Sequence, residues 1–115
     1  MKTITLKKIS IDDLFILQNA VVKFRFEKSC LLKTEDFANE YFNNLLILPI
    51  ANYLILRFRN KIENQNKEFG TLKLKIHEGI ILMQCCNDFE GKEKFEVNVG
   101  RKYLDEIHKL LINLL

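Results

Sequence analysis

The residues that could do chemistry include six cations that alternate with apolar residues. They fall in three stretches and are Lys23, Arg25, Arg57, Arg59, Lys73 and Lys75. If each stretch is a strand, alternate side chains point to opposite faces, so the six cations share the face opposite the core. Such a basic face could hold the phosphates of a nucleic acid. The neighbouring phenylalanines would point into the core and not stack on bases, so a merely solvated sheet face is the competing interpretation.

Three cysteines and two histidines are the candidates for nucleophilic, acid–base or metal chemistry. Cys85 and Cys86 are adjacent, and in a strand one would face inward and the other outward, which suits neither a zinc site nor a redox pair. His77 precedes Glu78 and could form an acid–base pair with it, with Cys86 as the nucleophile. None of these residues has a partner at a recognisable spacing. We predict no catalytic, metal or cofactor site and keep a small thiol- or histidine-dependent enzyme as an alternative.

The composition is that of an ordinary folded domain. With 48% hydrophobic and 29% charged residues, one proline and four glycines, the chain has the means to build one core, and residues 1–115 are predicted to form a single globular domain. A net charge of +3 is too small to predict strong nonspecific binding to nucleic acid or to acidic membranes. Any basic surface must therefore be local.

The longest apolar run, Leu45 to Leu56, is interrupted by Pro49 and Asn52. It is shorter than the roughly 20 apolar residues that a bilayer requires, so we read it as core and predict no membrane association. Three cysteines cannot all pair within one chain, which favours a reducing compartment and a cytoplasmic location. Frequent Lys, Asn, Ile and Phe, which have AT-rich codons, are typical of an AT-rich genome or of a mobile element such as a phage.

The N-terminal residues alternate in a way that predicts a first strand over residues 2–8. Ser10 is then a helix cap, and two aspartates in the first turn favour a helix that starts at Ile11. A helix running through to Lys28 would have apolar residues all around it and no clear polar face. We therefore predict that this helix ends near Asn19 and that a strand follows over residues 22–27.

A second helix start is indicated at Glu35, directly after a capping threonine. Apolar residues at helical spacing carry this helix to Leu48. Pro49 removes a backbone donor and disfavours the helical conformation of the residue before it, so the helix is predicted to end there. The chain then becomes extended.

The remaining sequence has a period of two and predicts a β-meander. Its strands are expected at residues 54–59, 71–76, 80–86 and 94–99, with a tight turn at His77-Glu78-Gly79. A closing helix starts at Arg101. The predicted fold class is α+β, a single antiparallel sheet of five or six strands with the helices starting at Ile11, Glu35 and Arg101 packed on one face.

The sequence favours a small non-catalytic binding or adaptor protein, because a well-formed core comes without the polar constellation that chemistry requires. Its partner is expected to be another protein or a second copy of the chain. Ile55, Ile80 and Leu82 would lie on the outer sheet face and give a homodimer its apolar contact. Nucleic-acid binding through the basic sheet face is the first alternative.

Overall fold

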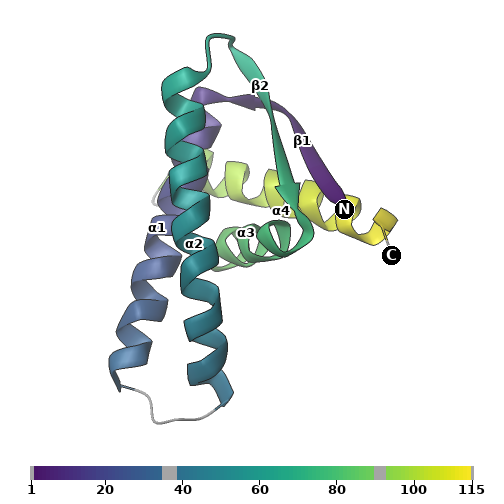
Figure 1. The fold of residues 1–115 in the computed structure, drawn as a ribbon. Coiled ribbons are helices and arrows are strands. Elements are labelled where there is room, and N and C mark those ends of the chain that lie inside the picture. Colours follow the sequence, from purple (N-terminus) through teal and green to yellow (C-terminus); the bar gives the residue numbers. More distant parts are fainter. Residues whose placement is uncertain (1, 35–38, 90–92, 115) are drawn as a thin grey trace.

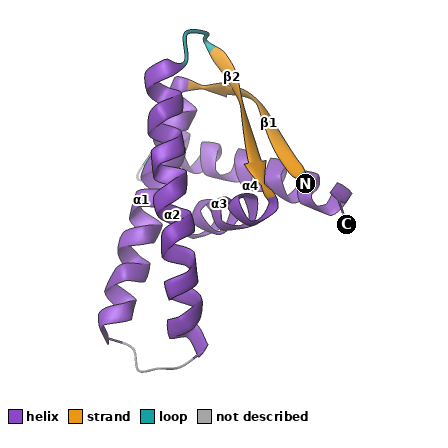
Figure 2. Cartoon of the chain, viewed as in Figure 1, coloured by secondary structure: helices purple, strands orange, loops and turns teal. Residues whose placement is uncertain are grey.

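The computed structural model describes residues 2–34, 39–89 and 93–114. Within them the element order is β1 (Thr3–Ser10), α1 (Ile11–Thr34), α2 (Asn39–Asn64), β2 (Phe69–Lys75), α3 (Ile76–Asp88) and α4 (Lys94–Leu114). Helices α1 and α2 lie antiparallel as a long hairpin, and its far end projects beyond α3, α4 and the two strands (Figure 1). The described residues are mostly helical, with one two-stranded antiparallel sheet (Figure 2).

The predicted five- or six-stranded sheet is therefore wrong. Four of the expected strands are helical: residues 22–27 lie in α1, 54–59 in α2, 80–86 in α3 and 94–99 in α4. A short alternating run is ambiguous because residues four apart also share one face of a helix. Leu54 and Phe58 illustrate this, since both are fully buried one helical turn apart. In α3 the buried residues recur in the same way, with Leu82 and Cys86 on one side.

Helix α1 begins where the sequence predicts but ends much later. Its start at Ile11 is confirmed, and the Ser10 hydroxyl accepts a hydrogen bond from the Asp13 backbone N–H at 3.1 Å, as an N-cap does. The predicted end near Asn19 is wrong, because the helix continues to Thr34. Along α1 apolar residues occupy the buried side and part of the exposed side, which they share with the exposed polar residues Asn19, Lys23 and Glu27.

Helix α2 passes through Pro49 without ending, so the predicted helix end at Leu48 is also wrong. Proline cannot donate to the Leu45 carbonyl four residues earlier, and this loss is tolerated because Pro49 is exposed to water, which can replace the missing donor. The opposite side of α2, with Ala51, Leu54 and Phe58, is fully buried. The predicted start at Glu35 lies outside the described residues.

The strands predicted around residues 2–8 and 71–76 are confirmed, and they pair with each other as β1 and β2. Ile4 pairs with Leu74 and Leu6 with Leu72, and all four side chains are buried. The sheet therefore covers the core with one face, as alternation predicts. The ladder is irregular between Leu6 and Ile9.

Helices α3 and α4 pack against the buried face of the sheet and complete the core. Glu78 accepts a hydrogen bond from the Lys75 backbone N–H at 2.8 Å, so residues 77–79 form the first turn of α3 and not the tight turn predicted. Helix α4 begins at Lys94, seven residues before the predicted start at Arg101. Because Tyr103 and Ile107 lie one turn apart and are fully buried, the helix packs along its whole middle section.

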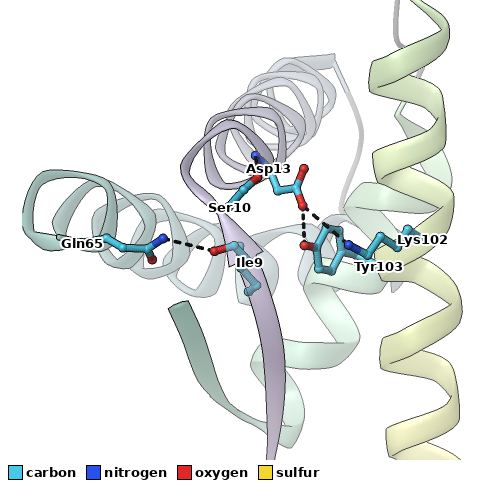
Figure 3. A network of polar contacts seen from close by, with 6 residues as sticks. All are labelled: Ile9, Ser10, Asp13, Gln65, Lys102 and Tyr103. Carbon is cyan, nitrogen blue, oxygen red and sulfur yellow. Dashed lines mark hydrogen bonds and ion pairs between the residues drawn. The ribbon is translucent and has the colours of Figure 1, made fainter. Parts of the chain in front are cut away.

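A small polar network fastens α4 to the junction of β1 and α1 (Figure 3). The Tyr103 hydroxyl donates to Asp13 Oδ2 at 2.6 Å, and Lys102 Nζ lies 3.8 Å from the same oxygen. Asp13 and Tyr103 are buried, whereas the Lys102 side chain is about half exposed. The hydroxyl is thus the main partner that compensates the buried carboxylate.

Candidate protein interface

The six cations predicted to share one sheet face are distributed over three elements. Lys23 and Arg25 lie on α1, Arg57 and Arg59 on α2, and Lys73 and Lys75 on β2. Two of the arginines make contacts within the chain: Arg25 donates to Asn52, and Arg57 donates to the Lys73 carbonyl and lies 3.6 Å from Glu78. The single basic sheet face does not exist, although nucleic-acid binding by these residues remains an untested prediction.

The two adjacent thiols are both buried on α3, which corrects the prediction that one of them faces outward. Burial raises the pKa of Cys86 to about 12. Burial, with the charges of Cys86 and Asp88, also raises the pKa of Cys85. A thiol that stays protonated at neutral pH is a poor nucleophile, so this geometry does not favour the thiol-dependent enzyme.

The other groups singled out by the sequence are also far from a catalytic arrangement. His77 is exposed, while Glu78 is buried and engaged by Lys75 and Arg57. In the described ranges no three His, Cys, Asp or Glu side chains gather as a metal site would require. No described helix combines the length and the apolar character needed to cross a membrane.

The most unusual surface lies on the outer side of α2. Five residues follow one another there at spacings of four, three, four and three: Phe42, Leu46, Pro49, Tyr53 and Leu56. This spacing places them in one stripe along the helix, the pattern of a coiled-coil seam. Leu46 is 69% exposed, Leu56 54% and Tyr53 50%. At about 100° per residue, the stripe points away from the buried side of the helix.

No charge interrupts this stripe. The segment from Tyr41 to Leu56 contains no Lys, Arg, Asp, Glu or His. Solvated helix faces normally carry charged residues, and a helix that is apolar on two sides normally has both sides covered. Exposed apolar residues elsewhere in the described chain, such as Phe95 and Ile112 on α4, have charged neighbours within one turn.

Helix α1 extends the apolar surface across the hairpin. Val22 and Phe26 of α1 lie opposite Leu56 of α2 along a groove of about 450 Å³, which Arg25, Asn52 and Ile55 also line. Phe26 is 65% exposed. We call the stripe of α2 together with Val22 and Phe26 the hairpin face.

The hairpin face is large enough to be an interface. An aromatic side chain buries about 150–250 Å² when fully covered, and the half-exposed residues of this face leave roughly 600 Å² of apolar surface open to water. That equals the upper end of the largest patch on a typical monomer, about 300–600 Å². It also approaches the roughly 800 Å² per partner of a standard protein interface.

The sequence contains the signal for this face, but it is hidden if residues 45–56 are all core and if a helix ends before Pro49, as predicted above. Only if the helix continues through Pro49 do Phe42, Leu46, Tyr53 and Leu56 fall on one line. Of the three residues expected to form a dimer contact, Leu82 is fully buried, Ile55 is partly buried and Ile80 is 41% exposed on α3.

None of the protein families, curated proteins or solved structures compared with this chain matches it.

Proposed function

We propose that this protein is a non-catalytic association module that pairs with a second copy of itself through the hairpin face. The observation that carries the proposal is the uncharged stripe of α2, exposed at coiled-coil spacing on the side opposite the core. In the pair, the α1–α2 hairpins of two copies form a four-helix bundle.

A second copy suits this surface because the stripe of α2, the main part of the hairpin face, is uncharged and apolar and therefore complementary to itself. In a two-fold pair the same patch lies on both sides, so residues of equal charge would face one another. Here the stripe has no charge to repel, and stripe packs against stripe at no electrostatic cost. A partner rich in charge would instead lose hydration without finding an opposite charge.

The hairpin also has the right dimensions. Helix α2 has 26 residues, which is about 39 Å at 1.5 Å per residue. The stripe covers the middle of that length, and four-helix bundles bury such stripes between helices that are nearly parallel or antiparallel. We expect Leu46 and Tyr53, at the centre of the stripe, to dominate the binding energy.

Sedimentation equilibrium of the purified protein tests the proposal. We expect a mass of twice the 13.6 kDa of one chain. Leu46→Glu and Tyr53→Glu should each give a monomer, because a two-fold pair would bury two new carboxylates, at a cost of about 2–5 kcal/mol each. Both positions are exposed in the single chain, so the circular dichroism spectrum should stay unchanged.

Ile112→Glu is the matched control. Ile112 is 52% exposed on α4, away from the hairpin face, and this variant should remain a dimer. A monomeric wild-type protein over the whole accessible concentration range would refute the proposal. A dimer that survives both hairpin substitutions would place the interface elsewhere and refute it equally. A monomer that retains a different protein in a Leu46-dependent way would refute self-pairing but keep the hairpin face as a binding surface.

A further inference from the structure

A second surface lies at the opposite end of the hairpin, where α2 ends beside the sheet. Lys7, Lys8, Lys61 and Lys67 line a cavity of about 600 Å³ there, together with Phe69. Among the residues that the structure describes, no acidic side chain lines it. We call these five residues the lysine groove.

The backbone of β1 is shaped to bring two consecutive lysines into this groove. In a regular strand Lys7 and Lys8 would point to opposite faces. The ladder is irregular between Leu6 and Ile9, and Lys8 has a φ of 57°. Lysine rarely adopts this left-handed conformation, which strains a residue that has a Cβ atom. The bulge therefore re-aims a side chain, as bulges near binding sites do.

Hydrogen bonds hold the walls of the groove together. The Gln65 side-chain amide donates to the carbonyls of Ile9 and Lys67, at 3.1 and 3.2 Å, and Figure 3 shows the first of these bonds. Gln65 thus joins the end of β1 to the segment that leads into β2. The groove is a formed feature of the fold and not only a gathering of mobile side chains.

The lysine groove carries more positive charge than is needed to balance the helix dipole of α2. The C-terminal end of α2 carries roughly half a negative charge from the helix dipole, which one lysine is sufficient to balance. Four lysines line the cavity. The excess positive charge predicts an anionic ligand.

Phe69 indicates which class of anionic ligand binds in the lysine groove. Its ring is 51% exposed and lines the same cavity as the lysines. Proteins that bind single-stranded nucleic acid combine cations for the phosphates with exposed aromatic rings on which bases stack. We propose that the lysine groove binds a short stretch of single-stranded nucleic acid, with the lysines on the phosphates and a base stacked on Phe69. This site is distinct from the six cations predicted by sequence, and it does not rest on the dimer.

Fluorescence anisotropy with a labelled oligothymidylate at low salt tests this inference. We expect binding that weakens as salt rises, and tighter binding to the single strand than to a duplex of equal length. Lys7→Glu combined with Lys8→Glu should lower the affinity by about tenfold or more and flatten the salt dependence. Phe69→Ala should lower it by about 5-fold to 100-fold without changing that slope, and Phe69→Tyr should restore it.

Matched controls lie on α4. Lys94→Glu with Lys109→Glu makes the same change in net charge at two exposed positions outside the groove, and Phe95→Ala removes another exposed ring. Both variants should bind nearly as the wild type does. Leu46→Glu should also bind normally, because one chain forms the whole groove.

The inference fails if no binding is detected at low salt, or if the control pair on α4 weakens binding as much as the groove pair does. It fails if Lys73→Glu with Lys75→Glu abolishes binding while the groove variants do not. Stronger binding to duplex, or complete competition by inorganic polyphosphate with no effect of Phe69→Ala, would contradict the stacked base.

Discussion

At the scale of single residues, the contact between Tyr103 and Asp13 connects the last helix to the first. The carboxylate is buried, and the hydroxyl 2.6 Å away is its closest side-chain donor. A buried acceptor that loses its donor costs more free energy than the hydrogen bond itself contributes. The stability of the whole domain should therefore be sensitive to one oxygen atom.

Tyr103→Phe removes that oxygen and keeps the ring. We expect the free energy of unfolding in urea to fall by about 1–3 kcal/mol. Lys102→Ala removes the exposed cation 3.8 Å from the same carboxylate and should change it by at most about 1 kcal/mol. Equal effects of the two substitutions would show that charge, and not the hydroxyl, compensates Asp13.

The buried thiols predict how stability depends on pH. Burial raises the pKa of Cys86 to about 12 and raises that of Cys85 as well, whereas an unfolded chain releases a thiol proton near pH 8.5. Above that pH the unfolded state binds fewer protons, so stability is fully present below it and is lost as the pH rises. Each thiol should contribute a slope of about −0.7 kcal/mol per pH unit at pH 8.5 that approaches about −1.4 kcal/mol per pH unit near pH 10.

Urea titrations at several pH values measure this slope. In a variant with Cys85→Ala and Cys86→Ala, the free energy of unfolding should fall less between pH 8.5 and 10, because the contribution of both thiols is removed. This smaller fall is expected even if the variant is less stable at pH 7. An unchanged slope would mean that the thiols are not buried in the folded protein.

At the scale of elements, α1 and α2 are helices with two apolar sides. One side packs in the core through residues such as Val21 and Leu54, and the other forms the hairpin face. The sequence rule that a helix needs a polar face led to a predicted strand at residues 22–27. That rule holds for a helix whose outer side faces water. A helix with a second apolar side needs no polar face there if a partner covers that side. The wrong strand at residues 22–27 and the exposure of Val22 and Phe26 thus have one cause, a second apolar side on α1.

Pro49 gives a direct test of the continuous α2. A proline inside a helix costs about 3 kcal/mol relative to alanine, and part of this cost is offset because proline restricts the unfolded chain. We expect Pro49→Ala to raise the free energy of unfolding by about 1–2 kcal/mol and to increase the helical circular dichroism signal slightly. If Pro49 instead ended a helix before an extended segment, alanine would leave stability unchanged or lower it.

At the scale of the whole molecule, the sequence was informative where a pattern had only one structural meaning. The Ser10 cap and the start of α1 at Ile11 follow from local chemistry, and the strands around Leu6 and Leu72 follow from an alternation that does pair. The alternation at residues 54–59 and 80–86 had two meanings, and packing decided for helix. Tertiary contacts, which local pattern does not contain, made that choice.

The candidate surfaces were harder to foresee than the elements. The stripe on α2 can be recognised in the sequence only if the helix continues through Pro49. The lysine groove depends on a positive φ at Lys8 and on the meeting of Lys7 with Lys61, which are far apart in the sequence. Phe69 lies in a polar stretch between the strands predicted at residues 54–59 and 71–76, and no pattern of spacing there indicates an exposed ring beside lysines.

The central claim, pairing of two hairpins through the hairpin face, is tested most directly by a distance between two copies. Cys30 on α1 is exposed, whereas Cys85 and Cys86 are buried, so a nitroxide spin label will react with Cys30 alone in the folded protein. Double electron–electron resonance should then give one narrow distribution of distances between the labels of the two copies, and Leu46→Glu should abolish the dipolar signal while Ile112→Glu preserves it. A wild-type protein without a dipolar signal, or a signal that Leu46→Glu leaves intact, would contradict the account.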